Sequence, residues 1–229
     1  MVYRSRAMTA AVLAALVSIL VVVGCSSSGS SGSGGAYSYR SSVPDDAADI
    51  RPAPIGDELP QVTLRTPRGE PFDLSRAVSE RPAVLIFYRG GWCPYCTLHL
   101  SELKTVEDEL RNLGFRILAI SPDRPAKLRE SIAEEELTYT LLSDSDMRAA
   151  RALGIAFRVD DKTVHKYKTE YEIDLEADSG RAHHLLPAPS VFIVDREGVI
   201  RFTYVNPNYK VRIDPQALVA AARGVVEEK

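Results

Sequence analysis

The chain has 229 residues, of which 45% are hydrophobic and 26% charged, and its formal net charge is −3. These values are typical of a globular protein, and they give no basic surface of the kind that binds nucleic acid. Only three cysteines are present, Cys25, Cys93 and Cys96, so a framework of several disulfides is excluded.

Residues 1–24 have the composition of a secretory signal peptide, in which Arg4 and Arg6 precede an apolar run over residues 7–23. The VVGC sequence that ends at Cys25 resembles a bacterial lipobox. This resemblance implies cleavage before Cys25 and attachment of a lipid to its sulfur. An uncleaved signal anchor is the alternative, because about 17 apolar residues are at the lower limit for a membrane span. With either outcome we expect the remainder to be extracytoplasmic, and the lipobox favours a lipoprotein anchored to a bacterial cell membrane.

Residues 25–54 are expected to be a tether and linker, since residues 26–35 are almost entirely serine and glycine. The folded domain is expected over residues 55–229. Its first predicted elements are an edge strand over residues 59–64, a turn at residues 67–70 and a short helical segment over residues 72–78.

The most informative stretch joins a predicted buried strand over residues 83–87 to a predicted helix that runs to about residue 112. Cys93 and Cys96 lie one helical turn apart at this junction, so their Cα atoms are expected about 5–6 Å apart, within disulfide reach. Amide groups at a helix N-terminus lower the pKa of a thiol, and Pro94 suits the first helical turn. A C-x-x-C pair at a strand–helix junction therefore predicts a redox-active dithiol.

Two other roles for the cysteine pair are weaker. A structural zinc site needs four ligands, and none of the histidines has ligand spacing relative to the pair. These histidines are His99, His165, His183 and His184. A purely structural bridge between Cys93 and Cys96 closes a very short loop, which constrains the unfolded chain little. We therefore expect a reactive pair, with no resident metal and no cofactor.

Strands and helices alternate after the redox segment, and this rhythm predicts a parallel sheet with right-handed crossovers. Strands are expected over residues 115–121 and 138–142, and helices over residues 125–135 and 143–153. Residues 160–186 are polar without a clear period, so they are either a solvated insertion or a cap over the redox site. A hairpin over residues 191–204 and a last helix over residues 216–226, capped by Asp214, complete the domain.

Residues 88–96, the loop and strand over residues 187–195 and the hairpin through Tyr204 resemble the alkyl hydroperoxide reductase/thiol-specific antioxidant (AhpC/TSA) group of the thioredoxin superfamily. More narrowly, they resemble its peroxiredoxin-like members with a C-x-x-C. The resemblance covers roughly residues 55–229. It implies a thioredoxin-like α/β fold with a central mixed sheet flanked by helices, and it implies that Pro189 is a cis proline facing the cysteines.

The resemblance assigns the attacking cysteine in two ways. In thioredoxins the first cysteine attacks, which is Cys93 here, and Cys96 resolves the mixed disulfide. The peroxiredoxin pattern P-x-x-x-T-x-x-C makes Cys96 the attacking residue and places Arg89 and Cys93 at its proline and threonine positions. Pro189 occupies the place of that family's distant arginine. We favour Cys96 as the peroxidatic thiol, and Arg89 is either a replacement cation or a surface side chain.

The expected activity is hydroperoxide reduction through a Cys93/Cys96 dithiol–disulfide cycle, with electrons from a thioredoxin-like donor. The candidate substrate-binding residues are Arg89, Trp92, Pro94, Tyr95 and Pro189. Trp92 and Tyr95 flank the thiols, where they either contact a partner chain or pack against the fold. The alternatives are a thiol–disulfide reductase resembling membrane-tethered cytochrome-maturation thioredoxins, and a metal-binding lipoprotein that uses the cysteines with His183 and His184.

Overall fold

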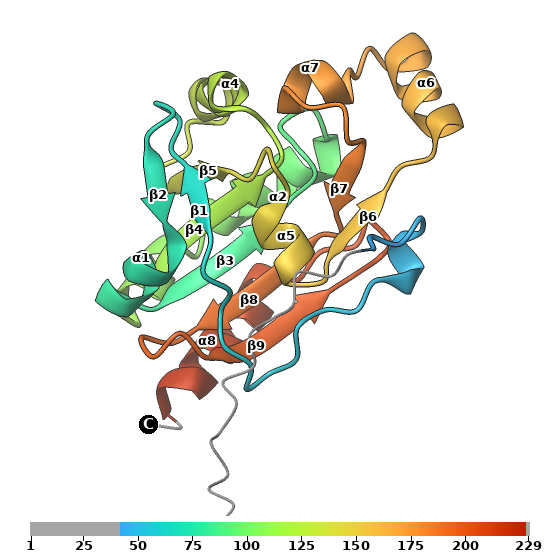
Figure 1. The fold of residues 1–229 in the computed structure, drawn as a ribbon. Coiled ribbons are helices and arrows are strands. Elements are labelled where there is room, and N and C mark those ends of the chain that lie inside the picture. The colour runs from blue at the N-terminus through green and yellow to red at the C-terminus, as the bar shows by residue number, and fades with distance from the viewer. Residues whose placement is uncertain (1–41, 228–229) are drawn as a thin grey trace, which may run out of the picture. The chain divides into compact units, whose positions relative to one another are not determined.

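The computed structural model describes residues 42–227 (Figure 1). The predicted signal peptide, the Ser/Gly tether and Cys25 lie outside the described residues. Within residues 42–227, none of the helices is both long enough and apolar enough to cross a bilayer.

A seven-stranded mixed sheet forms the centre of the domain, in the order β2–β1–β5–β4–β3–β8–β9. Its strands are β1 (Thr63–Arg65), β2 (Pro71–Asp73), β3 (Ala83–Phe87), β4 (Arg116–Ser121), β5 (Thr140–Ser143), β8 (Ser190–Val194) and β9 (Ile200–Val205). β3, β4 and β5 are parallel, whereas β8 runs antiparallel to β3 and pairs with β9 as a hairpin. The predicted parallel core and C-terminal hairpin are confirmed.

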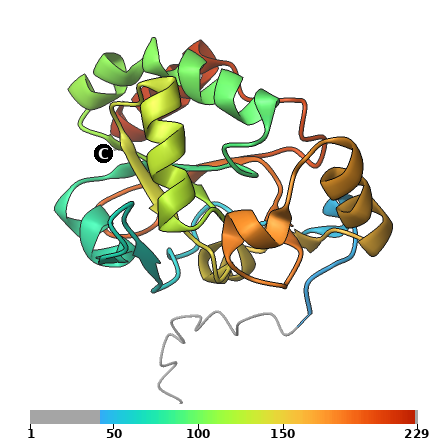
Figure 2. The same ribbon diagram turned by 90° about the horizontal axis from the view of Figure 1, so that it is seen from above.

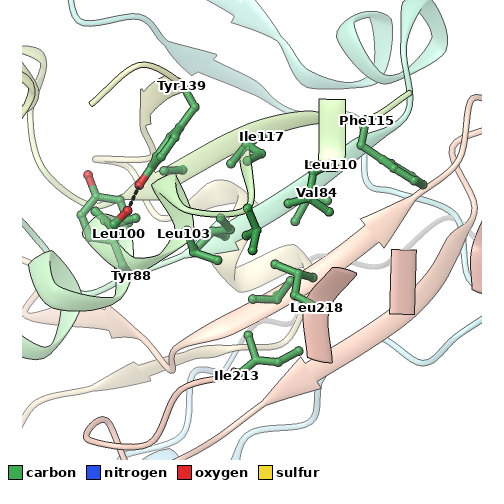
Figure 3. Close-up of a cluster of buried hydrophobic side chains, with 14 of the residues drawn as sticks. Val84, Tyr88, Leu100, Leu103, Leu110, Phe115, Ile117, Tyr139, Ile213 and Leu218 are labelled. Carbon is green, nitrogen blue, oxygen red and sulfur yellow. Dashed lines mark hydrogen bonds between the residues drawn. The ribbon is translucent and has the colours of Figure 1, made fainter. Parts of the chain in front are cut away.

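Both faces of the sheet are covered, because every residue of β3 and β8 is buried. Alternate residues of β3 enter two different apolar clusters. Val84 and Ile86 pack with residues of α2 (Pro94–Lys104), α3 (Glu107–Asn112) and α8 (Pro215–Glu227), as Figure 3 shows for Val84, Leu103 and Leu218. Leu85 and Phe87 pack on the other face against α1 (Leu74–Glu80) and α5 (Arg148–Ala152). The redox helix α2 is therefore fixed on β3 by the first cluster.

Local signals predicted several helix ends correctly. The Asp214 carboxylate accepts the N–H groups of Gln216 and Ala217 at the start of α8. α4 (Pro125–Glu135) has its predicted bounds. The expected long redox helix is instead two helices, α2 and α3. They separate at Thr105 and Val106, whose N–H groups turn back to carbonyls three residues earlier.

The helix predicted over residues 143–153 is shorter than expected, since only α5 forms there. The Asp144 carboxylate accepts the N–H groups of Ala149 and Ala150, so it caps the helix from outside. The polar stretch after α5 contains β6 (Ala156–Arg158), α6 (Asp161–Glu170), α7 (Leu175–Ser179) and β7 (Leu185–Pro187). β6 and β7 pair antiparallel, and α6 and α7 stand beside this pair (Figures 1 and 2).

Residues 42–54 were assigned to the linker, but they already contact the folded domain. The N–H groups of Arg51 and Ala53 donate to the carbonyls of Gly154 and Leu153, and a short 3-10 helix, η1 (Ala47–Asp49), lies within this segment. A Cβ at Gly154 would lie 2.0 Å from the Arg51 carbonyl oxygen, so the close contact requires glycine. The folded part thus begins N-terminal to the position expected from the sequence.

Candidate redox site

Cys93 is the N-cap residue of α2, and Cys96 lies in its first turn. The N–H groups of Cys96 and Thr97 donate to the Cys93 carbonyl at 2.8 Å and 3.1 Å, and Pro94 occupies the first helical position as predicted. Both thiols are free. Cys93 is 1% exposed and Cys96 0% exposed, so the pair sits beneath other side chains.

The two thiols have opposite acidities. The Cys96 thiol, hydrogen-bonded to the Cys93 sulfur, lowers the pKa of Cys93 from 9.0 to about 6, with help from the Arg89 and Arg212 guanidinium groups against the effect of burial. Burial raises the pKa of Cys96 well above its usual value, and the adjacent Cys93 raises it further. The pKa of Cys93 is therefore the lower of the two, which favours Cys93 as the thiolate and Cys96 as the hydrogen-bonding thiol.

Arg212 contacts the dithiol directly, although sequence reasoning missed it. Its Nη2 donates to the Cys96 sulfur at 3.3 Å. Arg212 belongs to the loop over residues 206–213 that joins β9 to α8, far along the chain from the cysteines. Nothing in the local pattern of this loop indicates the contact. The place expected for a family arginine, Pro189, is apolar, and the guanidinium comes from the loop instead.

Arg89 is buried, so our surface alternative for this residue is wrong. Its side chain is 4% exposed, and its Nη2 donates to the Tyr167 hydroxyl at 2.5 Å. The guanidinium carbon lies 4.2 Å from the ring centre of Tyr209, 5.0 Å from that of Trp92 and 5.7 Å from that of Tyr167. Cation–π attraction to three rings holds Arg89 as a fixed cation near Cys93.

The polar insertion covers part of the site, as the cap interpretation expected. Tyr167 comes from α6, and its ring centre lies 6.0 Å from that of Trp92. Val159, Leu175 and Leu186 form a small apolar cluster in the insertion, against which Trp92 and Tyr167 pack. The insertion thus holds the redox loop and Arg89 in place.

The candidate substrate-binding residues fall into separate places. Arg89 and Pro189 line one open pocket, together with Tyr167, Pro207 and Tyr209. Trp92 lines smaller neighbouring pockets. Pro94 is exposed, and the Tyr95 ring meets that of Tyr209 edge-on at 5.7 Å. The structure therefore places Arg89 and Pro189 in the same pocket, whereas Pro94 and Tyr95 are exposed to solvent.

The implied cis bond at Pro189 is wrong, because no peptide bond within residues 42–227 is cis. The Ala188 N–H donates to the Ile155 carbonyl, and the Pro189 carbonyl accepts the Asn206 N–H. The Ser190 hydroxyl donates to the Ala188 carbonyl. The segment between β7 and β8 is therefore extended with trans peptide bonds, and the carbonyls of Ala188 and Pro189 both accept hydrogen bonds.

Asp123 fixes the glycine turn in front of the dithiol. Its Oδ2 accepts the Gly91 N–H at 2.8 Å and the Ser121 hydroxyl at 3.0 Å. Gly90 has φ of +150°, and a Cβ there would lie 2.3 Å from Trp92 Nε1, so glycine is required. Burial raises the pKa of Asp123 from 3.8 to about 7.

A folded-state pKa above the unfolded value means that the native protein binds a proton more tightly than the unfolded chain. We therefore expect the free energy of unfolding to fall by a few kcal/mol as pH rises from about 4 to about 7. Asp123→Asn should make the free energy of unfolding depend less steeply on pH. The dependence that remains should come from Asp144, whose pKa is also raised by burial. Urea unfolding at several pH values measures this free energy for wild type and variant. An unchanged slope in the variant would refute the assignment.

The histidines do not support the metal-binding alternative. Both ring nitrogens of His183 are engaged, one with the Ser145 carbonyl and the other with the Leu185 N–H. His184 pairs with Glu176. In the described part of the chain, no three His, Cys, Asp or Glu side chains are grouped so as to hold a metal ion. The cysteines and these histidines therefore form no common ligand set.

The chain is similar to proteins of one known family. Residues 55–203 match the model of the AhpC/TSA family. The chain is 34% identical to the putative peroxiredoxin bcp of Haemophilus influenzae over 106 residues, which are 46% of this chain and 68% of that protein. It is 33% identical to peroxiredoxin Bcp of Escherichia coli, over 46% of this chain and 67% of the relative.

Solved structures show the fold. Peroxidoxin BcpB from Mycobacterium tuberculosis has a TM-score of 0.58 at 21% identity, over 75% of this chain and 97% of that one. Reduced Prx3 of Vibrio vulnificus in complex with hydrogen peroxide has a TM-score of 0.61 at 18% identity, over 75% and 96%. The expected thioredoxin-like α/β fold is confirmed.

Proposed function

Because the chain belongs to the AhpC/TSA family, we propose that it is a peroxiredoxin that reduces hydroperoxides through a Cys93/Cys96 dithiol–disulfide cycle. One observation carries the proposal beyond family membership. The pKa of Cys93 is lowered to about 6 at a helix N-terminus, with a second thiol one turn away to resolve the oxidised sulfur. A thiolate with a neighbouring thiol is what two-step peroxide reduction requires.

The proposed cycle assigns the attack to Cys93, in place of the Cys96 favoured from the sequence, because of the opposite pKa directions of the two thiols. The Cys93 thiolate attacks one peroxide oxygen, the O–O bond breaks, and water or an alcohol leaves after protonation. The resulting sulfenic acid condenses with the Cys96 thiol, which forms the disulfide and releases water. A thioredoxin-like dithiol then returns two electrons and two protons by exchange.

Stopped-flow mixing of the fully reduced protein with hydrogen peroxide tests the activity. Trp92 is the only tryptophan of the chain and lies next to Cys93, so its fluorescence should report the oxidation. From the thiolate fraction alone, about 90% against about 3% for a free cysteine at pH 7, we expect oxidation roughly thirty-fold faster than that of a free thiol or more, with one peroxide consumed per dithiol. Slow reaction with peroxide but fast exchange with a protein disulfide would favour the alternative thiol–disulfide reductase, which the N-cap thiolate of Cys93 also suits.

We also propose that the protein is an extracytoplasmic lipoprotein, attached to a bacterial cell membrane through Cys25. The charged start, the apolar run and the VVGC sequence support this. The test compares wild type with Cys25→Ala in a bacterial host by fractionation and mass spectrometry. We expect the lipidated wild type in the membrane fraction without residues 1–24, and no lipidated form of the variant. An intact N-terminus in wild type would support the signal anchor instead.

A further inference from the structure

Exposed apolar side chains gather beside the dithiol. Tyr95 and Leu98 are exposed on the first two turns of α2, and Tyr209 and Val211 are exposed on the loop over residues 206–213. Tyr95 and Leu98 are three residues apart and share a helix face. The Tyr95 and Tyr209 rings are in contact, which joins the helix to the loop. We call these four residues the α2–loop patch.

The aromatic pair of the α2–loop patch carries a positive charge, and the exposed acidic residues Glu102, one turn after Leu98, and Asp214, directly after the loop, border the patch. The Lys210 ammonium lies 5.9 Å from the Tyr95 ring centre and 6.0 Å from the Tyr209 ring centre. Residues 206–213 contain Lys210 and Arg212 and no acidic residue. An apolar surface with a basic edge is complementary to a protein face that combines apolar and acidic side chains.

The loop of the patch also covers the sulfurs. Tyr209 lies against the Arg89 guanidinium, and Arg212 donates to the Cys96 sulfur. Cys93 and Cys96 are buried, and a protein thiol that approaches them from the side of Arg212 contacts this loop first. The surface that the patch occupies is therefore a direct approach to the dithiol for the molecule that reduces the disulfide.

We propose that the α2–loop patch is the docking surface of the reductant, a thioredoxin-like protein with an acidic and apolar contact face. This inference rests on the proposed function. The donor thiolate attacks the Cys93 sulfur, and a mixed disulfide forms as the Cys93–Cys96 bond breaks. Cys96 leaves as a thiolate beside Arg212, whose guanidinium stabilises it. The second donor thiol passes its proton to the Cys96 thiolate and attacks the first donor sulfur, which releases Cys93 as a thiolate and oxidises the donor by two electrons to its disulfide.

Two variants with a matched control test the docking surface. Val211→Ser and Leu98→Ser remove apolar side chains of the patch. Val226→Ser on α8 is the control, because Val226 is 44% exposed and Val211 is 42% exposed. Peroxide turnover is measured with a bacterial thioredoxin and, separately, with dithiothreitol. We expect the double variant Leu98→Ser/Val211→Ser to raise the KM for thioredoxin roughly tenfold, with the dithiothreitol-supported rate unchanged.

A KM for thioredoxin that matches the Val226→Ser value would overturn the docking proposal. So would an equal loss with both reductants, because a docking surface affects only the protein donor. Lys210→Glu should weaken thioredoxin use further and reduce its dependence on salt. Peroxide oxidation of the reduced protein without any donor tests the proposed function separately. If that oxidation is fast while the patch variants behave like wild type, only the docking proposal fails.

Discussion

Cys93→Ser should abolish fast reaction with hydrogen peroxide, whereas Cys96→Ser should retain it and accumulate sulfenic acid at Cys93. The reason is the thiolate fraction at pH 7, which is about 90% for a pKa of about 6 and about 1% for a pKa of 9.0. The serine hydroxyl introduced by the second variant still donates a hydrogen bond to the Cys93 thiolate, so the loss of rate there should be less than tenfold. Stopped-flow rates and mass spectrometry of the peroxide-treated variants measure both effects.

The pH profile gives a second measure of the same assignment. The oxidation rate of wild type should rise through about pH 6 and reach a plateau by about pH 8, because only the ionised thiol attacks. Fast oxidation that survives in Cys93→Ser and disappears in Cys96→Ser would instead restore Cys96 as the peroxidatic residue. That result would mean that the position of Cys96 in the peroxiredoxin sequence pattern predicts the attacking thiol better than the pKa values of the two cysteines do.

The strand–turn–helix that carries the dithiol was predictable because its signals are local and agree. The apolar run of β3, the proline at the first position of α2 and the helical period after Cys96 all lie within a short stretch. The cap at Asp214 was predictable for the same reason. The break between α2 and α3 was not, because Val106 leaves the helix to fill the apolar cluster against the sheet, and only the tertiary structure shows that site.

The side chains around the sulfurs were less predictable, since their contacts join distant parts of the chain. Arg89 and Tyr167 are 78 residues apart in sequence, and Arg212 and Cys96 are 116 residues apart. Periodicity and caps report neighbours within a few residues, so neither pair has a local signal. The family pattern located a cation at the position of Pro189, but it has no means of locating one supplied by the loop before α8. Arg89 was therefore the one replacement cation named from the sequence, and Arg212 was missed.

Arg212→Met should slow reduction of the Cys93–Cys96 disulfide by dithiothreitol roughly ten- to a hundred-fold. A hydrogen bond from a charged group contributes about 1.5–3 kcal/mol, and here it stabilises the Cys96 thiolate that leaves during reduction. The same loss destabilises the reduced form relative to the disulfide, so the reduction potential of the pair should become more negative. A small reductant is used because it does not depend on the α2–loop patch.

Lys210→Met is the matched control, since it removes a cation from the same loop without touching a sulfur. It should leave reduction by dithiothreitol at the wild-type rate. Arg212→Lys should recover part of the rate, because an ammonium keeps the charge but lacks the planar geometry of the guanidinium. Thiol–disulfide equilibration against glutathione measures the potential. Equal rates and potentials in Arg212→Met and Lys210→Met would show that the arginine only packs against Cys96, and the leaving thiolate would then need another source of stabilisation.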